Sequence, residues 1–428
     1  MNGKLAILVG GGPAPGINSV IGAATIRSAL QGVEVLGIPD GFEGLMQGKI
    51  DHARPLTIDD VSRIHFRGGS ILGTSRANPT KDPKHLDAVV DALARLNVTR
   101  LITIGGDDTA FSASRVSLRA GDKLRVVHVP KTIDNDLDLP PDIDTFGFQT
   151  ARHVGAELVK NLMVDAFTTS RWYFIISMGR KAGHLALGIG KAAGATLTLI
   201  PEEFGDEAPL RHVVDTLVGA VVKRHAYGRR HGVAIIAEGV VLSINEKELG
   251  SLENVERDEH GHVRIAEIDI GDILKRAVRK ELAGLGLKPT IVSKDIGYEL
   301  RCADPIPYDM EYTRDLGYCA ARYVLSGGHA AMVSMQEGRF VPVPFEKLMD
   351  RETGHTRVRC IDVNSARYGI ARRYMIRVRR DDLDNPAELE RLAKAANLSA
   401  EDFRRRFEPL TKSEPVPLDI GTDGADGG

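Results

Sequence analysis

The stretch LITIGGDDTAFSASRVSLRAGDKLRVVHVPKTIDND, residues 101–136, determines the fold prediction for this chain. It contains two short apolar runs, residues 101–104 and 125–129, and a helix-like segment begins near Ala110 between them. A strand, a helix and a second strand in this order predict parallel strands joined by a right-handed crossover. Each run ends in a turn rich in glycine, proline or aspartate, and parallel sheets bind their ligands at such turns.

Further short runs rich in valine and isoleucine lie on both sides of this stretch, at residues 5–9, 33–38, 172–177, 195–200 and 233–237. Each is mostly apolar, which is typical of strands that are buried on both faces of a parallel sheet. The segments between them have helical periodicity; Leu86, Val89 and Leu93, for example, share one helix face. The pattern predicts an α/β protein with parallel sheets and helices on both faces.

The pattern changes after about Gly327. Residues 331–335 and 339–343 predict a β-hairpin, residues 374–378 a further strand and residues 386–396 a helix. Residues 413–428 are rich in proline, glycine and aspartate without apolar periodicity, so we predict a disordered tail.

Composition excludes several classes of protein. The chain has 428 residues, is 43% hydrophobic and 27% charged, and carries a net charge of −2 with both signs interspersed. This balance gives no general footprint for nucleic acid or for an anionic membrane. Three scattered cysteines fit a reducing compartment, and no apolar stretch approaches the roughly 18 residues of a membrane span. The apolar run at residues 5–9 is too short for a signal peptide, so we expect a cytoplasmic protein.

Two of the turns suit a phosphate and a metal ion. The first run ends in GGGPAPG, residues 10–16, whose glycines let backbone N–H groups approach a phosphate. It is not a P-loop, because Ile17 follows, and a tight turn without ligand is the alternative. In GGDDT, residues 105–109, Asp107 and Asp108 offer the oxygen ligands that Mg²⁺ prefers, unless one of them only caps the helix.

Two other turns suit proton and phosphoryl transfer. PKTIDND, residues 130–136, places a cation, a hydroxyl and two carboxylates together. A carboxylate that accepts a proton from an attacking hydroxyl needs another charged group to orient it, whereas DND alone would be a turn. Met178-Gly179-Arg180 follows the run at residues 172–177, and its arginine can clamp a phosphoryl group. Taken alone, this last motif is a weak signal and is more typical of a surface salt bridge.

These four turns, in this order, resemble the phosphofructokinase family. The resemblance extends over residues 5–328 and includes DGFEGL at residues 40–45, RGGS at 67–70, Ser75-Arg76, AEG at 237–239, GYELR at 297–301 and PYD at 307–309. Each motif is a modest signal, but together and in order they are specific.

The resemblance implies roles for individual residues. Asp134 matches the general base that deprotonates the 1-hydroxyl of fructose 6-phosphate, Asp136 supports its turn, and Asp107 matches a Mg²⁺ ligand. Arg76 matches a residue that bridges the donor and acceptor phosphates. The groups implied to hold the transferring phosphoryl are Thr132, Arg180 and the backbone at Gly11 and Gly12. The positions implied for the sugar phosphate are Thr132, Ile133, Asp134, Arg171, Met178, Gly179, Arg180, Glu238, Tyr298 and Arg301. Arg171 matches an arginine that reaches across a subunit boundary, which implies a homodimer or homotetramer.

Two departures from the ATP-using members indicate the phosphoryl donor. Asp108 replaces a glycine and Lys131 replaces another glycine. Asp108 puts a carboxylate where the α-phosphate of ATP would lie; at ~4 Å and an effective dielectric constant of ~20, the repulsion costs roughly 4 kcal/mol. Pyrophosphate has no third phosphate, and Lys131 supplies a charge for it. Both residues therefore join the catalytic and donor-binding candidates, and the pair resembles the pyrophosphate-dependent branch.

The resemblance predicts two parallel-sheet domains and a C-terminal segment. We expect residues 1–147 plus about 300–350 to bind the donor, residues 148–299 to bind the sugar phosphate, and residues 351–412 to form an extension. The predicted activity is reversible phosphoryl transfer from Mg²⁺-pyrophosphate to O1 of fructose 6-phosphate. The alternatives are an ATP-dependent phosphofructokinase, a more distant kinase of the lipid or NAD kinase type, and a sugar-phosphate-binding protein without turnover.

Overall fold

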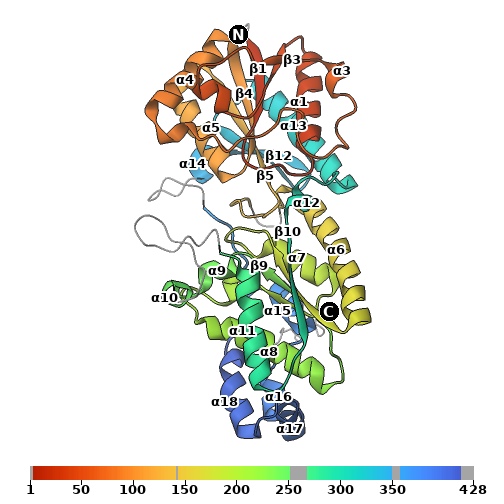
Figure 1. Cartoon of the computed structure of the whole chain (residues 1–428). Coiled ribbons are helices and arrows are strands. Elements are labelled where there is room, and N and C mark those ends of the chain that lie inside the picture. Colours follow the sequence, from red (N-terminus) through yellow and green to blue (C-terminus); the bar gives the residue numbers. More distant parts are fainter. Residues whose placement is uncertain (1–2, 141–142, 251–267, 349–356, 416–428) are drawn as a thin grey trace, which may run out of the picture. The chain divides into compact units, whose positions relative to one another are not determined.

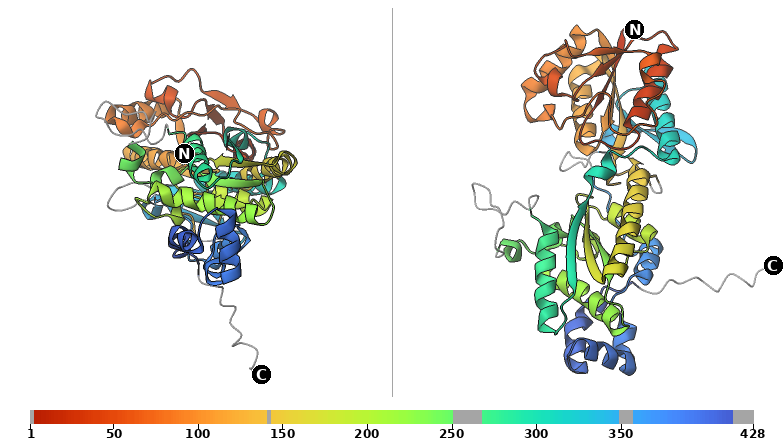
Figure 2. Two further views of the ribbon diagram at one scale, coloured as in Figure 1. Left: turned by 60° about the horizontal axis from the view of Figure 1, so that its bottom comes forward. Right: turned by 45° about the vertical axis from the view of Figure 1, so that its right-hand side comes forward.

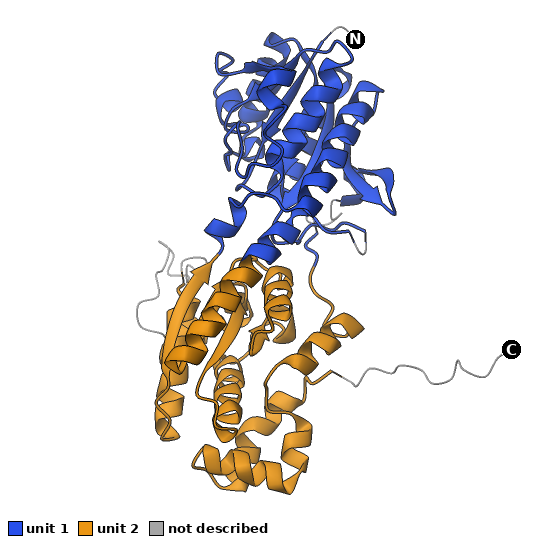
Figure 3. Ribbon diagram, turned by 90° about the vertical axis from the view of Figure 1, so that its right-hand side faces the viewer, with its two compact units in different colours: residues 1–154, 297–359 blue, residues 155–296, 360–428 orange. Residues whose placement is uncertain are grey.

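The computed structural model describes residues 3–140, 143–250, 268–348 and 357–415. The chain divides into two compact units, each built from two separate stretches (Figure 3). Unit 1 comprises Met1–Val154 and Gly297–Arg359, and unit 2 comprises Gly155–Ile296 and Cys360–Gly428. Most of the predicted disordered tail, residues 416–428, lies outside the described residues.

Unit 1 is built on an eight-stranded sheet with the order β12-β11-β5-β4-β1-β2-β3, and β6 pairs with β5 (Figure 1). The strands are β1 (Lys4–Val9), β2 (Val35–Ile38), β3 (Arg54–Leu56), β4 (Val98–Gly105), β5 (Arg125–Thr132), β6 (Phe146–Gly147), β11 (Ala331–Gln336) and β12 (Arg339–Pro344). The edge strands β3 and β12 are antiparallel to their neighbours, and the other pairs are parallel. The predicted parallel α/β class is confirmed, with two antiparallel edges added.

Helices cover both faces of this sheet. They are α1 (Ile17–Ala29), α2 (Glu43–Met46), α3 (Ile58–Val61), α4 (Pro83–Arg95), α5 (Asp107–Ala120), α12 (Tyr298–Arg301), α13 (Pro307–Leu325) and α14 (Phe345–Leu348). Short 3₁₀ turns lie at Pro79–Lys81 and Gly121–Lys123. Ala6 and Leu8 of β1 belong to the core that also contains residues of α4 and α5. Because side chains alternate along a strand, Leu5 and Ile7 face the opposite layer, where α1 and α13 pack together.

Unit 2 has a four-stranded, all-parallel sheet with the order β10-β7-β9-β8. The strands are β7 (Arg171–Ser177), β8 (Leu197–Leu199), β9 (Gly232–Ala237) and β10 (Thr290–Ile296). Its helices are α7 (His184–Ala193), α8 (Leu210–Ala226), α9 (Val240–Ser243), α10 (Glu246–Gly250) and α11 (Ile270–Gly284), with a 3₁₀ turn, η3, at Pro201–Glu203. Helix α6 (Phe148–Thr169) begins in unit 1 and continues into unit 2.

The C-terminal part of the chain adds four helices to unit 2, α15 (Ala366–Tyr374), α16 (Arg380–Asp384), α17 (Pro386–Ala395) and α18 (Ala400–Thr411) (Figure 2). Phe403 and Phe407 of α18 are fully buried. Gly219 of α8 lets this layer approach closely, because a Cβ there would lie 3.0 Å from Val378 and 3.4 Å from Phe407. The helix predicted near residues 386–396 is therefore one part of a larger helical layer.

Two predictions for this region have different outcomes. The hairpin is confirmed: β11 and β12 pair in antiparallel register, and Glu337 and Gly338 between them both have positive φ, as two-residue hairpin turns require. The strand at residues 374–378 is wrong. Tyr374 ends α15, and Ile376 makes one backbone hydrogen bond, its N–H donating to the carbonyl of Thr196 at 2.8 Å. The alternation of side chains at these residues resembles that of a strand. Arg377 is nevertheless buried in an ion pair with Glu203 and not within a sheet.

Among the described residues, we find no helix with the length and apolar character needed to cross a lipid bilayer.

A neutral histidine lies in the core where β4 and β5 meet. His128 is fully buried; its Nε2 is 3.0 Å from the carbonyl oxygen of Gly105, and its Nδ1 is 2.8 Å from Oγ1 of Thr103. Burial lowers the pKa of His128 from 6.5 to about 3, although the bond to Gly105 opposes the shift. The folded protein therefore holds an uncharged imidazole at a pH where the unfolded chain protonates it.

This predicts a specific loss of stability in acid. Below pH 6.5 unfolding takes up a proton at His128, so the wild-type free energy of unfolding falls by up to about 1.4 kcal/mol per pH unit more than that of His128→Gln. Urea unfolding at pH 7.5, 6.0 and 5.0 measures the difference, with exposed His52→Gln as the control that should follow the wild type. Parallel curves for wild type and His128→Gln would contradict this account.

Candidate functional site

The carboxyl edge of the first sheet brings together the glycine turn after β1 and the Ser75-Arg76 segment. The N–H of Gly11 donates to the carbonyl of Ser75 at 2.8 Å, and Gly10 forms a parallel bridge with Ser75. Gly11 has φ +80°, which favours glycine, and a Cβ on Gly10 would lie 2.4 Å from Oγ1 of Thr109. Exposed Arg76 therefore leaves the chain directly beside the glycine turn.

Asp107 and Asp108 lie in the first turn of α5 instead of in the loop before it. The N-cap is Gly106, so neither aspartate has the predicted alternative role of capping a helix that starts at Ala110. Asp107 is half-buried and Asp108 is exposed. A carboxylate in the first turn of a helix interacts favourably with the helix dipole.

Lys131 lies on β5 itself, since this strand continues through Thr132. Lys131 is only 5% exposed, and its Nζ donates to the carbonyl oxygen of Gly12 at 2.5 Å. A buried ammonium is costly unless it is paired, so this contact ties the end of β5 to the turn after β1. The predicted donor residues Gly11, Gly12 and Lys131 are thus neighbours in unit 1.

Asp134 and Asp136 are almost fully buried in the turn after β5, at 8% and 7% exposure. The N–H of Asp134 donates to Oγ1 of Thr132 at 3.0 Å, which makes the hydroxyl part of the turn. Asn135 between the two aspartates has φ +57°, a left-handed conformation that asparagine tolerates better than most residues. Ile133 is buried beside them.

Arg301 and Tyr298 of α12 belong to the same unit and complete this edge. A Cβ on Gly12 would lie 2.6 Å from Nη1 of Arg301, so the guanidinium rests directly on the glycine turn. The guanidinium also lies 4.7 Å from the centre of the Tyr298 ring, and Tyr298 is 75% exposed. Arg301 therefore lies against a residue predicted to bind the donor, although we had placed it with the sugar phosphate.

In unit 2, Glu238 organises the Met178-Gly179-Arg180 turn. One carboxylate oxygen of Glu238 accepts the N–H of Gly179 at 3.1 Å and that of Arg180 at 2.7 Å, and the N–H of Met178 donates to Ile296 at 3.1 Å. Arg180 has φ +53° and is exposed. A Cβ on Gly239 would lie 2.3 Å from the carbonyl oxygen of Arg180. The turn thus presents Arg180 at the carboxyl end of β7.

Arg171 is not brought to this turn. It begins β7, whereas Met178 follows the end of that strand. The six intervening steps of about 3.3 Å separate the two ends by roughly 20 Å. Arg171 lies 3.8 Å from Asp165, which also accepts a hydrogen bond from Tyr173 at 2.5 Å.

Comparisons with known proteins agree with this arrangement. The family model described as phosphofructokinase matches residues 4–324. A pyrophosphate–fructose 6-phosphate 1-phosphotransferase of Thermotoga maritima is 53% identical over 96% of this chain and 99% of its own. One of Naegleria fowleri is 47% identical over 95% of this chain and 96% of its own. The chain belongs to the phosphofructokinase family. The predicted family is confirmed.

A solved member shares the fold. The crystal structure of the pyrophosphate-dependent phosphofructokinase from Marinobacter aquaeolei matches with a TM-score of 0.64 at 18% identity, covering 98% of this chain and 94% of the other. At this identity the match concerns the fold alone.

In this phosphofructokinase an arginine that the sequence analysis missed holds the Asp134 turn. The guanidinium of Arg359 donates to the carbonyl oxygens of Asn135 at 3.1 Å and Ile143 at 2.7 Å, and also to Oδ1 of Asn135. The N–H of Arg359 donates to the carbonyl of Asp136 at 2.8 Å. Arg359 follows Asn135 by 224 residues, so no local pattern signals this contact.

The side chain of Asn135 is a second part of this clamp. Its Nδ2 donates to Asp144 at 2.8 Å, and its Oδ1 accepts the N–H of Thr145 at 2.9 Å. Oγ1 of Thr145 donates to the carbonyl of Thr132 at 2.6 Å. The middle residue of DND is therefore structural, and it connects the turn with the segment that leads into β6.

Asp309 of the PYD motif fixes the next element. It is fully buried, and its carboxylate accepts the N–H groups of Gly147 at 2.9 Å and Thr150 at 2.7 Å, together with the Thr150 hydroxyl. Burial raises the pKa of Asp309, while these three donors oppose the shift. The motif thus anchors the beginning of α6 to α13 within unit 1.

The residues present fit a Mg²⁺ ion that is held mainly by substrate. Within the described ranges there is no group of three or more His, Cys, Asp or Glu side chains that would form a complete metal site. Mg²⁺ commonly binds one or two carboxylates and completes its shell with phosphate oxygens and water. Asp107 and Asp108 beside the glycine turn match that pattern.

Proposed function

We propose that this protein transfers a phosphoryl group reversibly from Mg²⁺-pyrophosphate to O1 of fructose 6-phosphate, giving fructose 1,6-bisphosphate and phosphate. The observation that carries the choice of donor is the contact between Lys131 and Gly12, with Asp108 in the first turn of α5, the helix that follows the neighbouring strand β4. Lys131 supplies a fixed positive charge at the glycine turn, and Asp108 supplies a negative charge where a nucleotide would need space. The names of the two highly similar relatives agree with this activity.

Proton transfer is assigned to Asp134. As O1 bonds to the phosphorus and the bond to the leaving phosphate breaks, the hydroxyl proton passes to the Asp134 carboxylate. Thr132, Asn135 and Arg359 hold the backbone of this turn, so the carboxylate needs little reorganisation during the reaction. Asp136 supports the same turn through its carbonyl contact with Arg359.

The charge on the transferring group is assigned to arginine side chains and to backbone groups of the glycine turn. Arg180, Arg76 and the backbone at Gly11 and Gly12 would stabilise the phosphoryl oxygens, with Lys131 neutralising the leaving phosphate. Mg²⁺, held by Asp107 and the donor oxygens, would offset the charge of the diphosphate.

The sugar phosphate is assigned to Met178, Gly179, Glu238, Tyr298, Arg301 and Arg171. Arg171 begins β7, whereas Arg180 follows the end of the same strand. One copy of the chain therefore does not bring both arginines to the same ligand. A second copy would supply Arg171, so a homodimer or homotetramer is part of the proposal, and the expected compartment remains the cytoplasm.

A donor assay tests the choice of pyrophosphate. The wild type should be active with pyrophosphate and essentially inactive with ATP. The double variant Asp108→Gly, Lys131→Gly should lose activity with pyrophosphate and gain with ATP, by up to about three decades in kcat/KM if the repulsion of roughly 4 kcal/mol is removed. Exposed Asp122→Gly serves as the control. Wild-type activity with ATP but none with pyrophosphate would overturn the proposal.

The base assignment predicts a separation of binding from turnover. Asp134→Ser should lower kcat by roughly 10²–10⁴-fold, since no group remains to accept the O1 proton. Fructose 6-phosphate should still bind, as measured by calorimetry, because its phosphate contacts are elsewhere. If the variant keeps the wild-type rate, another group is the base.

Arg359 should act as a positioning residue for Asp134. Arg359→Ala should lower kcat about 10–100-fold while KM for pyrophosphate changes less than about threefold, because the turn loses its order while the donor contacts remain. The acid limb of the kcat–pH profile should move to higher pH, since the turn that carries the Asp134 base loses a nearby cation.

Two controls separate positioning from general damage. Arg357→Ala removes an exposed ion pair with Asp138 at 3.1 Å and should have little effect on kcat. Arg359→Lys keeps the charge without the fork of donors and should restore the pH profile better than the rate. An Arg359→Ala enzyme with wild-type kcat and pH profile would show that the contact is dispensable.

A further inference from the structure

Unit 2 contains a cavity outside the part of the chain that matches the family model. Its volume is about 340 Å³, and residues between Asn364 and Pro415 line it, whereas the family match ends at residue 324. Pockets for small ligands begin at about this size. None of the candidate site residues described above belongs to its lining.

The cavity lies along one face of α15 and against the end of α18. Ala366, Gly369, Ile370 and Arg373 all line it, and their spacing of three and four residues places them on one side of the helix. Gly369 leaves this side open, since a Cβ there would meet only Pro415, at 3.9 Å. Leu410 near the end of α18 contributes to the opposite wall.

The lining has an excess of positive charge. Four arginines line the cavity, Arg372, Arg373, Arg377 and Arg379. Among the described residues of the lining, Glu414 is the one carboxylate, and one of its oxygens accepts the N–H of Arg380 at 3.1 Å.

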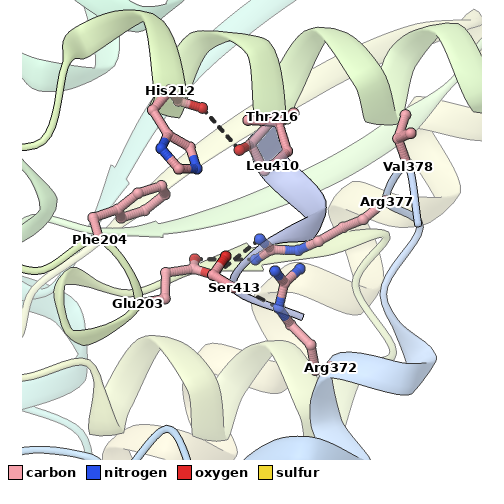
Figure 4. Close-up of a pocket in the computed structure, with 9 residues that line it drawn as sticks. All are labelled: Glu203, Phe204, His212, Thr216, Arg372, Arg377, Val378, Leu410 and Ser413. Atoms are coloured by element: carbon pink, nitrogen blue, oxygen red, sulfur yellow. Dashed lines mark hydrogen bonds and ion pairs between the residues drawn. The ribbon is translucent and has the colours of Figure 1, made fainter. Parts of the chain in front are cut away.

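Arg372 and Arg377 also line an adjoining pocket, in which Glu203 lies beside them (Figure 4). Glu203 forms a two-point ion pair with Arg377, with contacts of 2.9 and 3.0 Å, while Nε of Arg372 stays 3.8 Å from the same carboxylate. One buried carboxylate thus serves two buried guanidinium groups. Burial lowers the pKa of Arg372, and the nearby charge of Arg377 lowers it further. Even when Glu203 is added to the described residues of the lining, four arginines are balanced by only two carboxylates.

We propose that this cavity is a binding site for a small phosphorylated metabolite. Its phosphate would bind Arg372 and Arg373, where a dianion balances the excess of two positive charges. The remainder of the ligand would lie on Ile370, Val378 and Leu410. Planar guanidinium groups bind phosphate oxygens with paired hydrogen bonds, which an exposed lysine patch does not offer.

The wall of the cavity is connected with the Arg180 turn inside unit 2. Glu203 is adjacent to Glu202 in η3, and one oxygen of Glu202 accepts the N–H of Gly183 at 2.9 Å and that of Ile361 at 3.0 Å. Gly183 directly follows the turn that carries Arg180, in which Ala182 donates to Gly179 at 3.0 Å. An anion that draws Arg372 away from Glu203 therefore changes the charge next to the group that holds this turn.

Variants that fill or discharge the cavity test the proposal. Arg372 and Arg377 are too deeply buried for a clean substitution, so the informative changes are Gly369→Leu, which fills the space, and Arg373→Ala, which removes an exposed charge. Arg367→Ala is the matched control, because Arg367 is exposed on α15 and absent from the lining. Equilibrium dialysis with radiolabelled inorganic phosphate measures the number of sites in each full-length protein.

The wild type and Arg367→Ala should bind one more phosphate per chain than Gly369→Leu, and Arg373→Ala should bind it at least tenfold more weakly. Glycerol 3-phosphate and adenosine monophosphate should displace this phosphate, and tighter binding of either would identify the ester as the physiological class. Equal phosphate stoichiometry and affinity in all four proteins would overturn the site.

Hydrogen exchange locates the effect independently of activity. Phosphate should slow amide exchange in residues 366–379 of the wild type but not of Gly369→Leu, and exchange at residues 179–183 should respond more in the wild type. If residues 366–379 exchange at the same rate with and without phosphate, the cavity is not the binding site.

Discussion

The contact between the buried ammonium of Lys131 and the carbonyl of Gly12 constrains the carboxyl edge of the first sheet. β1 and β5 are not adjacent, since β4 lies between them. A charged group at 5% exposure needs a partner, and Nζ of Lys131 donates to the backbone of the glycine turn. The contact therefore determines where the glycine turn lies relative to Asp107 at the end of β4. The guanidinium of Arg301 lies against the same turn, so two cations, Lys131 and Arg301, lie next to Gly12.

Much of this architecture follows from local patterns. Strands buried on both faces require continuous apolar runs, and those runs placed β1, β4, β5, β7 and β9 correctly. The turns between strands and helices were visible because glycine and aspartate interrupt the runs, and parallel pairing collects the ends of the strands at one edge. The hairpin at residues 336–339 was equally local, since Gly338 supplies one of its two positive φ angles.

What the sequence could not indicate are contacts between distant segments. Arg359 reaches the Asp134 turn across 224 residues, and the pattern around it resembles an ordinary basic run. The strand predicted at residues 374–378 failed for a related reason. Apolar alternation there reflects packing against helices and an ion pair between Arg377 and Glu203, and periodicity does not separate these from a sheet. The contact between Arg301 and the glycine turn was equally invisible, because a motif gives the identity of a residue and not its neighbours.

These contacts give the part of the chain beyond residue 328 a structural role. Its first part ends at Arg359, which stabilises the turn that carries the proposed base in unit 1. Its second part begins at Cys360 and covers unit 2, where Arg377 neutralises Glu203 beside the residue that holds the Arg180 turn. The N–H of Ile361 donates to Glu202, so a single residue, Cys360, separates Arg359, which holds the turn in unit 1, from this contact in unit 2. A single segment therefore contributes to the Asp134 turn of unit 1 and, through Glu202, to the Arg180 turn of unit 2.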